Sequence, residues 1–351
     1  MGNAGLSLAI GRDWVDLKGK MSTRCVVTGG TGMVGSHVVE CLVGQGHQVT
    51  AITRPGSDAR FLQSLGVAIS PCGFDNADDL AKAISGADQV YHCASRVGDW
   101  GPWKLFEEQV VGVTRKLRDA CARVAVGRVA HVSSITVYGH PPKGLTTILE
   151  NETLGRWPVW FDYYARAKAE SEMLWKDYPG EYVILRPSWI LGPRDRYTLP
   201  RLIRAFQRIY TPLIGDGENL INIIYAGDVA EGIVLAGQTP GVSGEAFHLS
   251  SEGEIRAREF ADLLGKMIGG KGRTIFLPEW FVWSLASTVE FAGRLTSYPN
   301  PPILTRYAVR LMLRPCTFST AKAAEKLGWR RKVTIPEGLE KSLNWIRDNK
   351  V

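Results

Sequence analysis

Three polar side chains have the types and the spacing that proton transfer needs. Tyr164 and Lys168 are four residues apart, and Ser134 precedes Tyr164 by thirty residues. In a helix, this spacing places the tyrosine and the lysine on one face. A phenol has a pKa of about 10, and a neighbouring ammonium group would lower that pKa. We therefore predict that Tyr164 exchanges a proton with a substrate hydroxyl or carbonyl, while Ser134 binds the same oxygen.

A glycine-rich run near the N-terminus predicts a binding site for a pyrophosphate. The run Thr28-Gly29-Gly30-Thr31-Gly32-Met33-Val34-Gly35 directly follows a β-rich segment and opens a helical one. Glycines let the backbone approach a phosphate, and the N-terminus of a helix offers free N–H groups to it. A tight turn without a ligand is the alternative. The candidate contacts are Gly29, Thr31, Gly32, Met33, Val34 and Gly35.

The residue that follows the second predicted strand bears on the choice of dinucleotide. A carboxylate at this place would favour NAD, whereas an arginine would bind the 2′-phosphate of NADP. The segment Ala51-Ile52-Thr53-Arg54-Pro55 contains no acid, and Arg60 lies nearby. We therefore predict that Arg54 favours NADP. A solvated loop arginine and an NAD cofactor remain the alternative.

Short β-rich runs alternate with helical patterns through the first half of the chain. This alternation is typical of a doubly wound parallel sheet, which binds ligands beyond the carboxyl ends of its strands. The predicted strands are 25–28, 48–53, 67–70, 89–92, 128–133 and 182–186, and the predicted helices are 34–43, 58–65, 78–84, 103–124 and 164–176.

After Pro187 the alternation gives way to a region richer in helices, which predicts a smaller, mostly helical lobe. Its expected helices are 199–209, 227–236, 257–268 and 280–295, with brief strands at 222–225 and 245–249. We expect an N-terminal extension (1–20), a nucleotide-binding domain (21–186) and a substrate lobe (187–351). A segment near 220–240 is expected to return to the nucleotide-binding domain.

Composition and charge narrow the function classes further. The 351 residues carry a net charge of +7, and the last 51 residues hold the whole excess, with 11 basic and 4 acidic side chains. A nucleic-acid-binding face over the main body is therefore not expected. The six cysteines form no CxxC pair and the six histidines no i, i+4 pair. These patterns predict reduced cysteines, a cytoplasmic location and no metal site.

The run Trp280 to Val289 has no charged residue and is too short to cross a bilayer, which takes about 20 residues. A buried amphipathic helix is one interpretation of it. The other is a helix at a membrane surface or a lipid pocket, which together with the basic C-terminus predicts docking on an anionic membrane or an amphiphilic acid substrate.

From about Thr23 to Asp348 the chain resembles the extended short-chain dehydrogenase/reductases of the NAD(P)-dependent epimerase/dehydratase superfamily. Besides the residues above, the resemblance is carried by His92-Cys93-Ala94-Ser95, Val137-Tyr138-Gly139, Arg186-Pro187, Gly215-Asp216-Gly217 and Leu327-Gly328-Trp329. It implies a Rossmann fold and an NAD(P) cofactor. The cofactor contacts that it implies, with those given above, are Arg54, Asp75, Ala94, Ser95, Ser133, Tyr164, Lys168, Pro187, Ser188 and Ile190.

Departures from the family pattern shift the expected substrate. The adenine-binding aspartate of the family is absent from its usual place, where Asp75 is the candidate substitute, and Gln109 replaces a usual asparagine. Ile221 lies where sugar-nucleotide epimerases carry an arginine for the substrate diphosphate. The resemblance is thus closest to 3β-hydroxysteroid dehydrogenases and 2-alkyl-3-oxoalkanoate reductases, and implies a secondary alcohol or ketone on a hydrophobic substrate. Aromatic candidates for the pocket wall are Trp100, Trp103, Trp157, Trp160, Phe161, Trp189, Trp280 and Trp283.

Two other functions remain open at this point. One is an NAD-dependent sugar-nucleotide epimerase or dehydratase, and the other is a non-catalytic dinucleotide sensor. Sensors on this fold usually lose the tyrosine or the lysine, and this chain has both. A homodimer paired through helices 103–124 and 164–176 is a further family expectation.

Overall fold

In the computed structural model, the described residues are 22–141, 147–156, 161–207, 210–270, 273–295, 302, 304–313 and 316–349. The predicted N-terminal extension (1–20) and two of the candidate pocket residues, Trp157 and Trp160, lie outside them.

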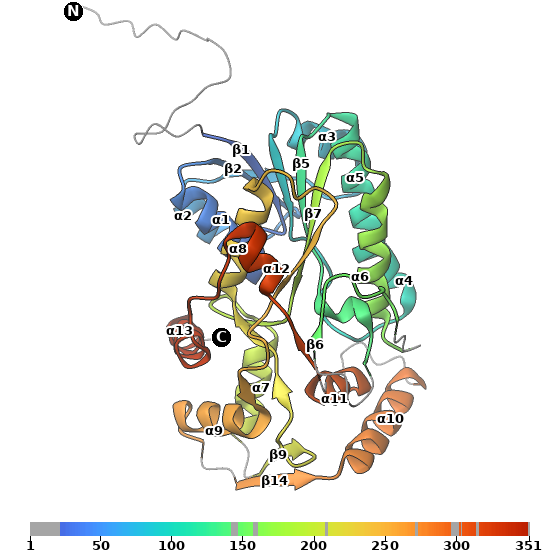
Figure 1. The fold of residues 1–351 in the computed structure, drawn as a ribbon, viewed down its shortest axis with the longest axis vertical. Coiled ribbons are helices and arrows are strands. Elements are labelled where there is room, and N and C mark those ends of the chain that lie inside the picture. The colour runs from blue at the N-terminus through green and yellow to red at the C-terminus, as the bar shows by residue number, and fades with distance from the viewer. Residues whose placement is uncertain are drawn as a thin grey trace, which may run out of the picture.

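A central sheet of seven strands organises the molecule (Figure 1). The strand order is β12-β7-β5-β4-β1-β2-β3, and every neighbouring pair is parallel. This arrangement confirms the predicted doubly wound Rossmann fold. The strands are β1 (Arg24–Thr28), β2 (Gln48–Thr53), β3 (Ala68–Pro71), β4 (Gln89–His92), β5 (Arg128–Val132), β7 (Glu181–Pro187) and β12 (Ala246–Leu249).

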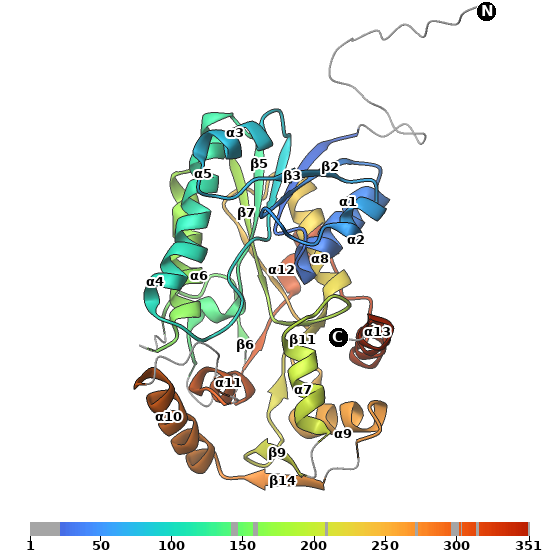
Figure 2. The ribbon, with the colours of Figure 1, turned by 180° about the vertical axis from the view of Figure 1, so that it is seen from behind.

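Helices cover both faces of this sheet, as the two opposite views show (Figures 1 and 2). Because both faces are covered, the strands are apolar on both sides and contribute to two separate cores. One face carries α1 (Met33–Gly44), α2 (Arg60–Ser64), α8 (Ala226–Gln238) and α12 (Ala321–Leu327). The other carries α3 (Ala77–Ile84), α4 (Trp103–Phe106), α5 (Val113–Arg123) and α6 (Tyr163–Met173).

Two of the predicted helices are less regular than their sequence pattern indicates. The segment predicted as one helix, 103–124, contains a π-helical stretch, Glu107–Gly112, between α4 and α5. The predicted helix 164–176 ends earlier as an α-helix and continues as the 3₁₀ turn Leu174–Asp177.

The lobe beneath the sheet is mostly helical, as predicted (Figure 2). Its helices are α7 (Thr198–Phe206), α9 (Ala257–Met267), α10 (Glu279–Leu295), α11 (Arg306–Met312) and α13 (Ile335–Asn349). Short strand pairs join distant segments: β8 (Trp189–Leu191) with β11 (Ile223–Tyr225), β9 (Tyr210–Ile214) with β14 (Arg273–Leu277), β10 (Leu220–Ile221) with β13 (Ile255–Arg256), and β6 (Thr147–Ile148) with β15 (Thr317–Phe318).

The chain returns from the lobe to the central sheet twice. First α8 packs along α1 and β12 adds a parallel strand beside β7, and later α12 packs on α8 and β12. Among the described residues, no helix is long and apolar enough to cross a membrane, and no group of three or more His, Cys, Asp or Glu side chains could hold a metal ion.

Candidate active site

The predicted site residues meet at the carboxyl edge of the central sheet. The register pairs Thr28 with His92, His92 with His131, and Val132 with Leu185, so β1, β4, β5 and β7 end side by side. The glycine-rich loop follows β1, Ala94-Ser95 lie just beyond β4, and Ser133-Ser134 follow β5. Pro187 ends β7, and Ser188 follows it. Residues spread over 160 positions of the chain are thereby brought to one edge.

Ser134 meets Tyr164 at the end of β5, and Lys168 follows Tyr164 by one turn of α6. The hydroxyl groups of Tyr164 and Ser134 are hydrogen-bonded to each other. Lys168 is 3% exposed, and its ammonium group donates a hydrogen bond to the Val132 carbonyl at 2.9 Å. Ser134 also accepts a hydrogen bond from the Thr136 N–H at 3.2 Å, which fixes its hydroxyl oxygen at the end of β5.

The pKa values of this group differ from the simple expectation. Burial raises the pKa of Tyr164 to about 12, although the hydrogen bond from Ser134 acts in the opposite direction. The expected lowering by Lys168 is not found. Burial lowers the pKa of Lys168 itself to about 8, against the opposing effect of Glu172. At neutral pH the tyrosine is therefore a proton donor and the lysine is charged.

Buried polar contacts at both ends of α6 hold Tyr164 and Lys168 in place. At the N-terminus, Asp162 accepts a hydrogen bond from the Ala165 N–H at 2.9 Å and binds His140 through its other oxygen at 3.1 Å. Near the C-terminus, Glu172 forms a buried ion pair with Arg186 at 2.7 Å. Arg186 comes from β7, so this pair ties the helix to the sheet. Aspartate is a preferred N-cap residue, which was the available sequence signal for Asp162.

The glycine-rich loop has the shape that a pyrophosphate requires. Gly29 has a φ of +70°, and a Cβ atom there would lie 2.7 Å from the Ala94 backbone. A Cβ atom on Gly35 would lie 2.2 Å from the Gly29 carbonyl oxygen, so no larger residue fits. Gly32 precedes α1 without a side-chain cap, which leaves backbone N–H groups at this helix end for a ligand. Thr31, Met33 and Val34 lie on the same turn.

Polar atoms around this loop also fit a dinucleotide. The Thr28 hydroxyl accepts a hydrogen bond from the Ala94 N–H at 3.2 Å and contacts His92 Nδ1 at 2.8 Å, which positions Ala94 and Ser95. The hydroxyl oxygens of Ser133 and Ser188 are buried and have no hydrogen-bond partner among the described residues. Buried hydroxyl groups normally have partners, so a bound ligand would satisfy both.

The other predicted cofactor residues have different surroundings. Arg54 is exposed directly after β2 and makes no ion pair with any described residue, whereas Arg60 is bound by Asp58 at 2.7 Å. The Asp75 side chain is fully exposed and pairs with Lys116 at 3.3 Å. Ile190 lies in β8, opposite Ile224 of β11.

Two contacting residues were not predicted from the sequence. The ring of Tyr307 in α11 meets the ring of Tyr164 edge-on at 6.2 Å. Arg194 donates a hydrogen bond to the Ser36 hydroxyl at 2.7 Å, pairs with Glu40, and thereby joins the lobe to α1. Both contacts join segments more than 140 residues apart, and no local pattern marks such pairs.

The aromatic residues proposed as pocket walls divide into three groups. Phe161, just before α6, and Trp283 of α10 contact each other, with their ring centroids 5.8 Å apart. Trp189 packs on Phe260 in the lobe core, while Trp100 is buried and Trp103 packs on Tyr163. Trp280 is 71% exposed, so it is not a wall of a buried pocket.

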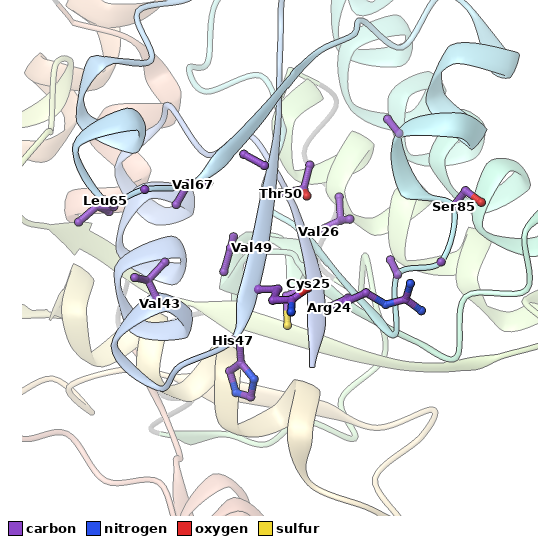
Figure 3. A pocket seen from close by; sticks show the side chains of 16 residues that line it. Arg24, Cys25, Val26, Val43, His47, Val49, Thr50, Leu65, Val67 and Ser85 are labelled. Carbon is purple, nitrogen blue, oxygen red and sulfur yellow. The ribbon is translucent and has the colours of Figure 1, made fainter. Parts of the chain in front are cut away.

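A separate hollow lies at the opposite, amino-terminal edge of the sheet (Figure 3). Its volume is about 460 Å³, and its lining includes Arg24, Cys25, His47 and Leu65. None of the predicted site residues lines it. Because ligands of doubly wound sheets bind beyond the carboxyl ends, this hollow is not the candidate active site.

Comparison with known proteins agrees with this geometry. Residues 25–250 match the model of the NAD dependent epimerase/dehydratase family. The 2-alkyl-3-oxoalkanoate reductase of Shewanella oneidensis is 26% identical over 90% of this chain and 84% of its own length. The 3beta-hydroxysteroid-dehydrogenase/decarboxylase isoform 1 of Arabidopsis thaliana is 29% identical over 91% of this chain and 79% of its own.

A solved structure shows the same fold. UDP-glucuronic acid 4-epimerase from Bacillus cereus, in complex with NAD, has a TM-score of 0.72 and 23% identity, and covers 93% of this chain and 100% of its own. The family match spans more than half of the chain, and the relatives agree with it. The chain therefore belongs to the NAD dependent epimerase/dehydratase family and is an NAD(P)-dependent enzyme of the extended short-chain dehydrogenase/reductase type.

Proposed function

We propose that this protein is an NADP(H)-preferring oxidoreductase that interconverts a secondary alcohol and a ketone on a hydrophobic substrate. The observation that carries the proposal is the hydrogen bond between Tyr164 and Ser134, with the buried Lys168 one turn further along α6.

The chain's own residues handle the proton of this reaction. In reduction, the Tyr164 hydroxyl donates its proton to the ketone oxygen, and Ser134 donates a second hydrogen bond to the same oxygen. The charge of Lys168 favours the phenolate that remains. In oxidation the proton moves in reverse. When bound, the nicotinamide supplies or accepts the hydride.

The residues around the glycine-rich loop would hold the dinucleotide. Gly29, Gly32 and Gly35 allow its phosphates to approach the backbone of α1, and Ser133 and Ser188 have hydroxyl groups free to bind it. The exposed, unpaired Arg54 supports the preference for NADP, because a 2′-phosphate would find a guanidinium group there.

A hydrophobic substrate is supported by the surroundings of Tyr164. Tyr307 touches its ring, and Phe161, three residues before Tyr164, packs on Trp283 of α10. Ile221, within β10, offers no charge to a sugar diphosphate. The names of the relatives from Shewanella oneidensis and Arabidopsis thaliana point to oxo acid and steroid substrates for those proteins.

We also propose a peripheral contact with a membrane through the exposed side of α10, where Trp280, Phe291 and Leu295 are each at least 65% exposed. A homodimer paired through the segment 103–124 and α6, and a cytoplasmic location, remain predictions from the sequence.

The central test is the variant Tyr164→Phe with Tyr163→Phe as its matched control. Tyr163 packs on Trp103 and Phe106, and no lysine follows it four residues later. With NADPH and a panel of hydrophobic ketones, we expect kcat to fall about 10²- to 10⁴-fold in Tyr164→Phe only. Full turnover by Tyr164→Phe would refute the mechanism. Tightly bound NAD released on denaturation, without consumption of added NADPH, would favour the epimerase alternative.

A further inference from the structure

The short helix α11 places an arginine near the start of the helix that carries Tyr164. Tyr307 touches the ring of Tyr164, and Arg310 follows Tyr307 by three residues on the same face of α11. The guanidinium group of Arg310 lies 4.9 Å from the Trp283 ring and 5.7 Å from the Phe161 ring. Phe161 itself precedes Tyr164 by three residues. Arg310 therefore lies between α10 and the start of the catalytic helix.

Arg310 has no anionic partner within the part of the chain that the structure describes. Its guanidinium group contacts the two aromatic rings, and no carboxylate of a described residue lies within 4.0 Å of it. In the sequence, the stretches that adjoin Phe161, α10 and α11 and lie outside the described residues, 157–160, 296–301, 303 and 314–315, contain no Asp or Glu. Arg306, one turn earlier, differs: it forms an ion pair with Glu290 at 2.7 Å.

Asp162 is the carboxylate whose charge acts on Arg310, but it forms its hydrogen bonds with other groups. Asp162 affects the pKa of Arg310 electrostatically, but its two oxygens bind the Ala165 N–H and His140. Arg310 is partly buried, and burial lowers the pKa of its guanidinium group. A partly buried guanidinium group without a direct ion pair is unfavourable, and an anionic ligand bound to it would reduce that cost.

We propose that Arg310 is an anion-binding residue of the substrate site and takes the carboxylate of a hydrophobic oxo or hydroxy acid. The planar guanidinium group can bind a carboxylate through two parallel hydrogen bonds, and the Trp283 and Phe161 rings lie beside it. The same rings would cover the apolar part of the substrate. The assignment rests on the proposed oxidoreductase function, and it adds a charge requirement to the substrate.

The first experiment compares an acid with its neutral counterpart. The substrates are 3-hydroxydecanoate and its methyl ester, oxidised with NADP⁺ by the wild type, Arg310→Gln, Arg310→Lys and Arg330→Gln. Arg330 is an exposed arginine outside the site and serves as the matched control. We expect Arg310→Gln to lower kcat/KM for the acid about 10- to 100-fold, mainly through KM, and to leave the ester unchanged.

Arg310→Lys keeps the charge without the two-pronged geometry, so it should recover part of the loss. Arg330→Gln should behave like the wild type. Equal losses on acid and ester, or no loss on either, would overturn the assignment.

A binding measurement separates this proposal from the proposed reaction. Calorimetric titration with octanoate, octanamide and uridine diphosphate needs no turnover. We expect octanoate to bind the wild type, to bind Arg310→Gln at least about tenfold more weakly, and octanamide to show no such difference. If no alcohol or ketone is turned over, the oxidoreductase proposal fails, and this difference still decides the role of Arg310. Loss of uridine diphosphate binding without any effect on octanoate would overturn the carboxylate assignment.

Discussion

At the scale of single residues, burial acts on Tyr164 and Lys168 in opposite directions. Removing a charged group from water is unfavourable, so burial raises the pKa of the phenol to about 12 and lowers that of the ammonium to about 8. The tyrosine therefore keeps its proton over the whole neutral range. The lysine is the member of the pair that titrates near physiological pH.

This difference predicts the pH dependence of the reaction. Lys168 is charged below pH 8 and neutral above it. We expect kcat/KM for ketone reduction to be flat below that pH and to fall above it, as the charge that favours the phenolate is lost. The measurement is a pH profile between about pH 6 and pH 10 for the wild type and Lys168→Arg. Arginine stays charged, so an unchanged descending limb in this variant would assign the titration to another group.

The cofactor preference depends on another single residue. Arg54 is exposed without an ion pair, and a 2′-phosphate would bind its guanidinium group. We expect Arg54→Ala to lower kcat/KM with NADPH about 10- to 100-fold and to change it little with NADH. The matched control is Arg60→Ala, because Asp58 already binds Arg60. Equal effects on kcat/KM with NADPH and with NADH would show that Arg54 does not bind the 2′-phosphate.

At the scale of elements, the turn between β1 and α1 sets the geometry of the cofactor site. The backbone of this turn passes so close to itself that Gly35 has no room for a side chain. The same helix contains Gly44, where a Cβ atom would meet nothing within 4 Å. One helix thus offers a glycine with a steric role and a glycine without one.

We expect Gly35→Ala and Gly44→Ala to differ sharply. Gly35→Ala should weaken cofactor binding more than about tenfold and lower Tm, because the Gly29 carbonyl must move. Gly44→Ala should leave binding unchanged and raise the free energy of unfolding by up to about 1 kcal/mol, as alanine favours a helix more than glycine does. Cofactor titration and thermal unfolding measure both effects. Equal behaviour of the two variants would contradict the close approach seen at Gly35.

The sequence predicted the elements of the sheet better than those of the lobe. Strands 48–53 and 89–92 match β2 and β4 to the residue, since apolar runs between helices are local signals. The pair β9 and β14 joins segments about 60 residues apart, and β6 and β15 about 170 apart. No local pattern encodes such pairings. Tyr164, Lys168 and Ser134 also carry local signals, namely the i, i+4 spacing and the end of a predicted strand. Tyr307 and Arg310 carry no such signal, because only tertiary packing brings α11 near Tyr164.

At the scale of the whole molecule, five of the basic side chains after residue 300 form ion pairs with other parts of the protein. Lys322 and Lys326 pair with Glu245, and three other basic residues of this region pair with Glu290, Glu254 and Glu231. These partners come from the lobe, α8 and the segment before β12. The charge therefore helps to hold the C-terminal segments on the body of the protein, and less of it remains for an external surface.

The exposed face of helix α10, next to the C-terminal segments, is apolar rather than basic. Helix α10 buries Val282 and Ala286 and leaves Trp280, Phe291 and Leu295 at 71%, 65% and 71% exposure. One of the two interpretations of this segment, a buried amphipathic helix, therefore describes only the inner face of α10. The outer face is exposed. An exposed row of large apolar side chains on one helix is typical of an interaction surface.

We therefore expect membrane association to depend on α10 more than on lipid charge. In co-sedimentation, the wild type should bind vesicles of neutral lipid and bind anionic vesicles somewhat more strongly. The triple variant Trp280→Ser, Phe291→Ser, Leu295→Ser should lose binding to both and keep its activity on a water-soluble ketone, which reports that it is folded. Tyr197→Ser removes an aromatic side chain that is 67% exposed elsewhere and should bind like the wild type.

Negligible binding of the wild type to both kinds of vesicle would exclude the membrane as the partner of α10. Anionic-only binding that survives the triple variant would assign the contact to the basic residues instead.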